Sequence, residues 1–337
     1  MQTQASAVHE SSGRIEAYGR GGIEAPVAIR PTVTRHSGLT TTVPREFVHR
    51  AAVAEVLLTG WEPVPQGSLD SFVVRAQWPR GHSLFAQSGG YQDPMLLVES
   101  VRQVGSLLAH AEFAVPFGHQ FMMRDIAITA TADLLLATPK PTEVELHTEC
   151  RDVVRRGANL ADMRYDVTAL IGGVALATAS AAFRCISPGV YRRLRGGRPT
   201  GTTQVVGAPV DPAAVGRCSA ENVVLTEEMA AVDGRRSWGL RIDSSHPIFF
   251  DHPVDHIPGM VLLEAARQAA YAATGRPDML VTGISATFTR YAELDAPCRI
   301  EAVPGMPVAG ETPVRVTGVQ EGEKVFVADL TLSATSR

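Results

Sequence analysis

The chain has 337 residues, a length that predicts two domains of roughly 150 residues each rather than one small domain. Hydrophobic residues make up 45% and charged residues 20% of it, so each half can bury a core and an intrinsically disordered chain is excluded. The net charge of −4 provides no basic field for a polyanion, which argues against nucleic acid as a partner.

The four cysteines are scattered and form no C-x-x-C pair, which favours reduced thiols in a cytoplasmic protein over a disulfide framework or a thiolate zinc site. The N-terminus does not resemble a secretory signal. The longest uncharged run, residues 167–183, carries Gly172-Gly173 in its middle. We therefore expect a hairpin there and no membrane span.

In chain order, residues 1–40 are rich in Gly, Ser, Thr and Ala and are expected to be a flexible N-terminal arm. Residues 41–186 are expected to form a first domain. Its predicted helix covers about 94–113, and its predicted strands lie near 47–60, 71–78, 121–132, 142–154, 160–171 and 174–186. Residues 187–212, where Pro, Gly and Arg interrupt the apolar alternation, are expected to be the interdomain linker.

The second domain, residues 213–337, repeats this order of elements. Its predicted helix covers about 258–274, and its predicted strands lie near 221–226, 237–243, 280–291, 297–303, 312–320 and 324–333. One helix followed by a run of hairpin strands predicts an α+β domain in which the helix packs on an antiparallel sheet.

Three motifs of the first domain recur in the second at offsets of 164 to 167 residues. Arg50 with residues 55–59 matches Arg217 with residues 222–226. The pattern beginning at His82 matches that at His246, and residues 95–103 match 260–268. Such steady offsets indicate the duplication of one domain.

Both predicted helices carry a polar stripe in an apolar setting. Glu264, Arg267 and Gln268 lie at i, i+3 and i+4, and Glu99, Arg102 and Gln103 repeat the arrangement. An unpaired buried charge is costly, so the stripes must be paired or used. They are either structural ion pairs or a carboxylate tuned by burial beside a guanidinium suited to phosphate or an oxyanion.

Pro258-Gly259, Glu264 and Gln268 resemble the central-helix motif of hot-dog dehydratases and thioesterases. Over about residues 40–335 the chain more closely resembles the A-factor biosynthesis family, which makes γ-butyrolactone and related signals in actinomycetes. The segments that carry this resemblance are 47–61, 76–82, 93–105, 116–123 and 251–260. The resemblance implies a tandem double hot-dog fold, a pseudo-dimer within one chain.

The resemblance also implies an acyltransferase that moves a β-ketoacyl group from acyl carrier protein to the hydroxyl of dihydroxyacetone phosphate. The ester then closes by intramolecular condensation to a butenolide phosphate, the precursor of a butyrolactone or furan-type signal. Neither a metal nor a redox cofactor is implied. The phosphate ester and the acidic carrier protein are the expected partners.

In that chemistry Glu264 or Glu99 would accept the hydroxyl proton, and Arg267 or Arg102 would hold the phosphate or an oxyanion. The site around Glu264 is favoured, because free backbone N–H groups follow Pro258 whereas the first repeat has Asp93-Pro94. His256 is the histidine best placed to reach that helix, with Asp255 expected to orient it. The other expected binding residues are Gln268, Gln103, Gly259, His252 and His82.

Other functions remain open at this level. The histidine that dehydratases place fourteen residues before the helix glutamate is Phe250 here, which argues against β-elimination. A thioesterase or hydratase, or an acyl-binding or carrier-binding module without catalysis, would share the helix motif. Pro253 disfavours a metal site formed by His252 and His256. A basic cluster in the linker either docks the carrier protein or is merely solvated: Arg192, Arg193, Arg195 and Arg198.

Overall fold

The computed structural model describes residues 39–65, 67–68, 70–196, 198, 207–232 and 235–335. The fold is that of one compact unit, Thr40–Arg337. The arm expected at residues 1–40 lies outside the described residues except for its last two.

Each half consists of one long helix and six strands. In the first half these are β1 (Leu58–Pro63), β2 (Ser71–Trp78), α1 (Met95–Ala111), β3 (Gln120–Ala130), β4 (Thr142–Arg156), β5 (Asn159–Ile171) and β6 (Val174–Ile186). In the second half they are β7 (Leu225–Val232), β8 (Arg235–Leu240), α3 (Gly259–Thr274), β9 (Leu280–Phe288), β10 (Cys298–Pro304), β11 (Glu311–Gln320) and β12 (Glu323–Ser333).

The twelve strands form one antiparallel sheet in the order β1-β2-β4-β5-β6-β3-β9-β12-β11-β10-β8-β7. The halves join where β3 pairs with β9, with Asp125 opposite Thr287 and Thr129 opposite Gly283. Outward from this seam the order is β3-β6-β5-β4-β2-β1 in the first half and β9-β12-β11-β10-β8-β7 in the second, so equivalent strands occupy equivalent places. The sheet therefore has a pseudo-twofold axis, as the sequence repeat predicts, and the division into domains at 41–186 and 213–337 remains our interpretation of it.

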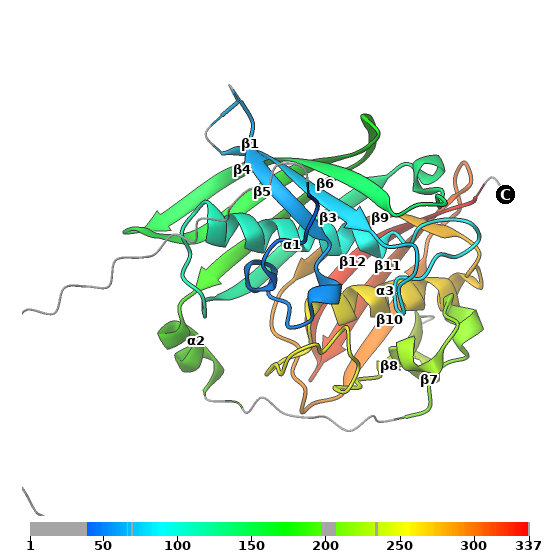
Figure 1. The fold of residues 1–337 in the computed structure, drawn as a ribbon. Helices are drawn as coiled ribbons and strands as arrows, with labels where there is room; N and C mark the ends of the chain where they lie inside the picture. Colours follow the sequence, from blue (N-terminus) through cyan, green and yellow to red (C-terminus); the bar gives the residue numbers. More distant parts are fainter. Residues whose placement is uncertain are drawn as a thin grey trace, which may run out of the picture. The chain divides into compact units, whose positions relative to one another are not determined.

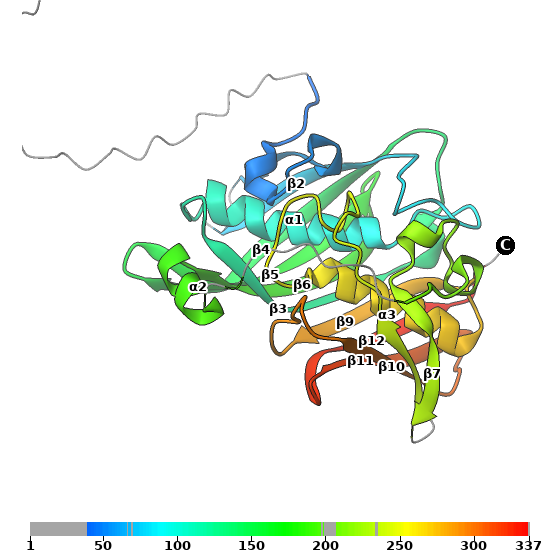
Figure 2. The same cartoon turned by 90° about the horizontal axis from the view of Figure 1, so that it is seen from below.

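The helices α1 and α3 lie side by side on one face of the sheet (Figures 1 and 2). Nearly every residue of both is buried, including Glu99 and Glu264. The sheet covers one side of each helix, and the other helix and the loops cover the rest, so an apolar surface on nearly every side is needed. The predicted enclosure of both helices is confirmed.

The strands predicted at 47–60 and 221–226 begin later than expected. Short 3-10 turns precede them: η1 (Arg45–Val48), η2 (Val53–Glu55) and η5 (Ala220–Asn222). The Leu57 N–H donates to Gln103 Oε1 at 3.0 Å, and the Val224 N–H donates to Gln268 Oε1 at 2.9 Å. A helix side chain thus satisfies backbone groups that a neighbouring strand would otherwise pair.

The expected linker contains a helix, α2 (Pro188–Arg195). Proline occupies its first turn, and Gly196 ends it with φ of 60°. Both are ordinary helix boundary signals. The helix is not evident from the sequence, because its many arginines leave no helical spacing of apolar residues. Residues 199–206 lie outside the described part of the chain.

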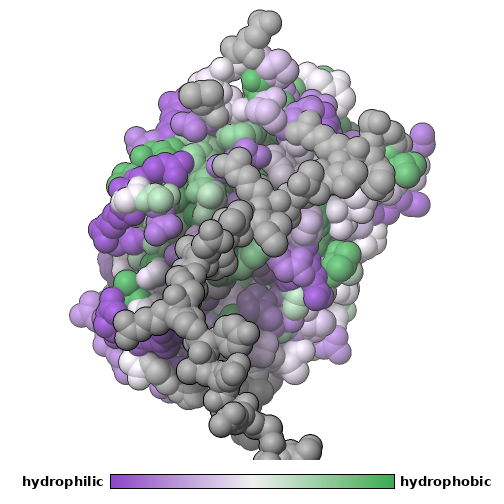
Figure 3. Space-filling model, turned by 60° about the vertical axis from the view of Figure 1, so that its left-hand side comes forward, coloured by the Kyte–Doolittle hydropathy of each residue, from purple (hydrophilic) through white to green (hydrophobic). Residues whose placement is uncertain are grey.

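The hairpin predicted at Gly172-Gly173 is confirmed, since it joins β5 to β6 with φ of 57° and 80°. Among the described residues, no helix is long and apolar enough to cross a membrane. Figure 3 shows a face on which hydrophobic residues occur in small groups between hydrophilic ones.

Gly105 tests how closely α1 packs on the sheet. A Cβ at this position would lie 2.6 Å from the Tyr165 hydroxyl, which itself donates to Val101 O at 2.8 Å. We expect Gly105→Ala to lower the free energy of unfolding by about 1–3 kcal/mol through overpacking. Gly189→Ala in α2 is the matched control, because its Cβ would meet nothing within 4 Å. Equal thermal stability of the two variants would contradict this.

Candidate active site

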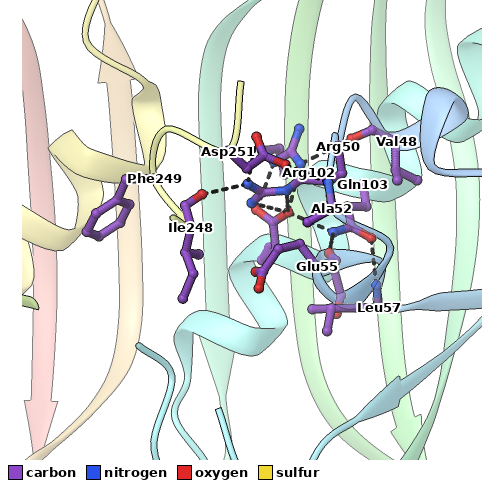
Figure 4. Close-up of polar contacts among 12 residues, drawn as sticks. Val48, Arg50, Ala52, Glu55, Leu57, Arg102, Gln103, Ile248, Phe249 and Asp251 are labelled. Carbon is purple, nitrogen blue, oxygen red and sulfur yellow. Dashed lines mark hydrogen bonds and ion pairs between the residues drawn. The ribbon is translucent and has the colours of Figure 1, made fainter. Parts of the chain in front are cut away.

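Glu99 is the centre of a buried network on α1. Its Oε1 accepts hydrogen bonds from Arg50 Nη2, Arg102 Nη2 and Gln103 Nε2, each at 2.7 Å. Figure 4 shows Arg50, Arg102 and Gln103 converging beside Asp251. Burial alone would raise the pKa of Glu99, but Arg102 and Arg50 outweigh it and hold the pKa at about 2. Glu99 is therefore an ionised anchor for two guanidinium groups.

Glu264 is the centre of the corresponding network on α3. Its Oε1 accepts from Arg217 Nε at 2.8 Å and Gln268 Nε2 at 2.6 Å, and its Oε2 accepts from Arg267 Nη2 at 2.7 Å. Here burial raises the pKa of Glu264 to about 7, against the effect of Arg217 and assisted by the nearby Asp93 carboxylate. The same residue types thus titrate differently in the two halves.

The networks differ in their access to solvent. The side chain of Arg102 is 22% exposed, whereas those of Arg267 and Glu264 are 6% and 0% exposed. Arg267 Nη1 is held by both oxygens of Asp93, at 2.8 and 2.9 Å. The α3 network is therefore sealed, and the α1 network opens at Arg102.

A cavity of about 290 Å³ lies between the halves, which we call the seam cavity. Arg102 lines it from α1, and Pro258, Gly259 and Met260 line it from the first turn of α3. No side chain caps that turn, so its backbone N–H groups and the helix dipole favour a negative atom there. Other residues that line the cavity are His49, Arg50, Arg124, Asp251, His252, His256 and Arg290.

His256 lines the seam cavity as one member of a histidine–carboxylate pair. Its Nδ1 lies 2.8 Å from Asp255 Oδ1, which confirms that Asp255 orients this ring. From α2, Tyr191 donates to the same Oδ1 at 2.6 Å and Arg195 Nε to Oδ2 at 3.1 Å. Burial would raise the pKa of Asp255, but these hydrogen bonds lower it. The carboxylate therefore stays ionised and accepts a hydrogen bond at the His256 ring.

His49 is a second imidazole in the cavity wall. Its Nε2 lies 2.7 Å from His110 Nε2, and its ring stacks on Phe121. Burial lowers the pKa of His49 to about 3, and the charges of His110 and Arg102 add to this. His49 is therefore neutral at pH 7 and a weaker base than a histidine paired with a carboxylate.

The chain resembles known proteins along nearly its whole described length. The family model of the A-factor biosynthesis hotdog domain matches residues 32–187 and 201–336. A 2-oxo-3-(phosphooxy)propyl 3-oxoalkanoate synthase of Streptomyces virginiae is 50% identical over 86% of this chain and 96% of its own. A synthase of the same name from Streptomyces coelicolor is 42% identical over 87% and 92%.

This chain belongs to the A-factor biosynthesis hotdog family. Among solved structures, an oleoyl thioesterase from Lactobacillus plantarum superposes with a TM-score of 0.51 and 12% identity, covering 79% of this chain and 97% of its own. At that identity the likeness shows the fold alone, and it agrees with the α+β double hot-dog expected from the sequence.

For this member of the family, the structure divides the expected site residues into three groups. Arg102, His256, Gly259 and His252 line the seam cavity. Glu99 holds Arg102 from behind, and Gln103 in turn donates to Glu99. Glu264, Arg267 and Gln268 do not line it, so the site expected around Glu264 is not the one that opens. His82 also lies elsewhere, because its Nδ1 accepts from two backbone N–H groups and its Nε2 lies 3.3 Å from Glu55.

Several contributing residues were not assigned a role from the sequence. In the sequence Arg50 and Arg217 mark the repeat, and their recurrence at an equal offset is the available signal of a shared role. Asp93 is visible there as a difference between the repeats. Tyr191 and His49 gave no signal, because their partners lie 64 and 61 residues away in sequence.

The structure also bears on the metal and carrier-protein expectations. Within the described ranges, no three His, Cys, Asp or Glu residues are grouped to hold a metal ion. In the basic cluster, Arg195 is buried against Asp255 and Glu293, and Arg198 pairs with Asp295 at 2.9 Å. Of that cluster, Arg192 and Arg193 remain as exposed cations on α2.

The low pKa of Glu99 has a consequence for stability in acid. The folded-state pKa of about 2 lies below the ordinary glutamate value of 4.5, so the stabilising effect of the carboxylate is present above pH 4.5 and lost as the pH falls toward 2. We expect wild type to exceed Glu99→Gln in stability by about 3 kcal/mol at pH 6, from that shift. The difference in melting temperature should shrink steadily below pH 4.5. A difference independent of pH would show that Glu99 is not an ionised partner of the arginines.

Proposed function

We propose that this chain forms a 2-oxo-3-(phosphooxy)propyl 3-oxoalkanoate, the product named for its relatives, from a β-ketoacyl thioester and dihydroxyacetone phosphate. The observation that carries the proposal is the seam cavity. It brings together a guanidinium on α1, the uncapped first turn of α3 and a histidine–carboxylate pair. These are the groups that an acyl transfer to a hydroxyl requires.

In the transfer step, the hydroxyl oxygen of dihydroxyacetone phosphate attacks the thioester carbonyl carbon. His256 accepts the hydroxyl proton and, supported by Asp255, returns a proton to the thiolate that leaves. The new C–O bond replaces the C–S bond, so the products are the ester and the free carrier thiol. His256 suits this role better than His49, whose burial keeps it neutral and weakly basic.

The charge that develops on the carbonyl oxygen needs donors that are already in place. Arg102 is held by two hydrogen bonds to Glu99, at 2.8 and 2.7 Å, so little reorganisation is needed when the oxyanion forms. The free backbone N–H groups in the first turn of α3 can donate to the same carbonyl oxygen as its negative charge develops. Arg102 and α3 therefore form the oxyanion site.

The phosphate requires a second positive region. Arg124 and Arg290 also line the seam cavity and are 38% and 53% exposed. Among the described residues Arg290 has one ion pair, at 3.9 Å from Glu323, which leaves most of its guanidinium for a ligand. We assign the phosphate to this outer part of the cavity, since exposed arginines bind phosphate through paired hydrogen bonds.

The ester can then close on itself. The methylene between its two carbonyls loses a proton, the carbanion attacks the ketone of the phosphooxypropyl group, and loss of water gives the butenolide phosphate. The oxyanion site stabilises the enolate in this step as it does the tetrahedral intermediate in the first. The reaction consumes no redox equivalents.

Acyl carrier protein is the proposed donor of the acyl group. The exposed face of α2 offers Arg192 and Arg193 to an acidic partner, while Tyr191 and Arg195 on the same helix contact Asp255 beside the cavity. A carrier bound to α2 would thus lie next to the catalytic pair.

Product analysis tests the proposal directly. The purified protein is incubated with a β-ketoacyl thioester, with and without dihydroxyacetone phosphate, and the products are identified by mass spectrometry. We expect the phosphorylated ester or butenolide only when the phosphate ester is present. Free β-keto acid at an equal rate in its absence would indicate a thioesterase, and no turnover at all would indicate a binding module.

The two equivalent arginines provide a matched test of which copy is active. We expect Arg102→Met to lower kcat/KM by about 100- to 1,000-fold, because it removes an oxyanion donor. Arg267→Met should mainly lower the melting temperature, because it removes one of the two guanidinium groups that the buried Asp93 and Glu264 share. Loss of activity in Arg267→Met with Arg102→Met active would return the site to Glu264, as first expected.

A further inference from the structure

The two polar networks are alike almost bond for bond. Arg50 Nε donates to Glu99 Oε1, as Arg217 Nε does to Glu264 Oε1. The match extends across the seam, where Arg50 Nη1 donates to Ile248 O and Arg217 Nη1 donates to Leu84 O. Because so many contacts correspond, a single departure between the copies is informative.

Such a departure is Asp93, which precedes α1 and has Pro258 as its counterpart before α3. Asp93 Oδ1 accepts from the Met95 N–H at 2.8 Å and from Arg267 Nη1 at 2.8 Å. Its Oδ2 accepts from Arg267 Nη1 at 2.9 Å and from Arg217 Nη1 at 3.4 Å. With its side chain 3% exposed, the carboxylate is enclosed between a helix N-terminus and two arginines.

The same donors in the first copy have no such acceptor. The counterparts of the Met95 N–H and Arg267 Nη1 are the Met260 N–H and Arg102 Nη1, and both residues line the seam cavity. Among the described residues, neither donor has a hydrogen-bond acceptor. Asp251 lies 3.8 Å from Arg50 and accepts from the Ala51 N–H, so it does not take this place.

We propose that Asp93 is a built-in anionic ligand that closes the second copy. Its carboxylate lies where a ligand's negative oxygen binds between Arg102 and the Met260 N–H in the open copy. The chain accordingly has one anion site at the seam cavity and a second that its own side chain fills. The location of the open site rests on the proposed function, whereas the filled site stands on the Asp93 contacts alone.

Charge balance supports this role. Arg217 and Arg267 carry two positive charges into the interior, and the carboxyl groups of Glu264 and Asp93 are the acidic groups that contact both of them. Removal of the Asp93 carboxylate would leave an uncompensated cation beside a space the size of a carboxylate. A small anion from solution can then take its place.

Chemical rescue tests the filled site without reference to catalysis. The double variant Arg102→Met/Asp93→Ala is compared with Arg102→Met, so that the open site contributes to neither. We expect the double variant to melt several degrees lower and sodium formate to restore more than half of that difference saturably. Arg102→Met should respond to formate no more than to chloride. An unchanged melting temperature, or no recovery specific to formate, would overturn the proposal.

A reciprocal variant keeps the proposal testable if the double variant does not fold. Pro258→Asp places a carboxylate at the corresponding position of the open copy, and Pro258→Asn is the uncharged control. We expect stabilisation of the protein by inorganic phosphate or formate to persist in Pro258→Asn and to be lost in Pro258→Asp. Equal anion binding by both variants would overturn the correspondence, even if the protein proves to catalyse a different reaction.

Discussion

The fold depends on the burial of charge at the junction of two helices. Each half buries a carboxylate that is paired with two guanidinium groups, and this desolvation is tolerable only if the buried charges meet partners in good geometry. Arginines from the loops before the sheet supply those partners and reach carbonyl groups of the opposite half. The ion networks therefore fix how the halves meet as well as how each helix lies in its own half.

This requirement also explains why identical motifs behave differently. Glu99 accepts from two arginines, and they hold its pKa at about 2 although Asp251 lies 3.8 Å from Arg50. Glu264 shares its arginines with Asp93, so burial prevails and raises its pKa. Asp93 therefore fills the space beside Arg267 and closes the Glu264 network to solvent. In the described part of the chain the Glu99 network has no such residue, and its Arg102 faces the seam cavity.

Much of the architecture follows from the sequence, because strand alternation, the enclosed helices and the repeat offsets are local or periodic signals. Nearly all strands and both long helices lie within a few residues of their predicted positions. The strand predicted near 47–60 is an exception, because β1 begins only at Leu58 and Gln103 pairs with the backbone of Glu55 and Leu57 just before it. The choice between Glu99 and Glu264 could not be made from spacing, since accessibility depends on which side chains from the other half cover each stripe.

Fusion of the two hot-dog units into one polypeptide has a consequence for how the copies can diverge. In a dimer of identical subunits every substitution appears at both symmetry-related places, so a carboxylate that blocks one pocket blocks its twin. Here position 93 and position 258 are encoded separately. A substitution can therefore fill one pocket and stabilise the core, while the other pocket keeps its ligand and can change its specificity.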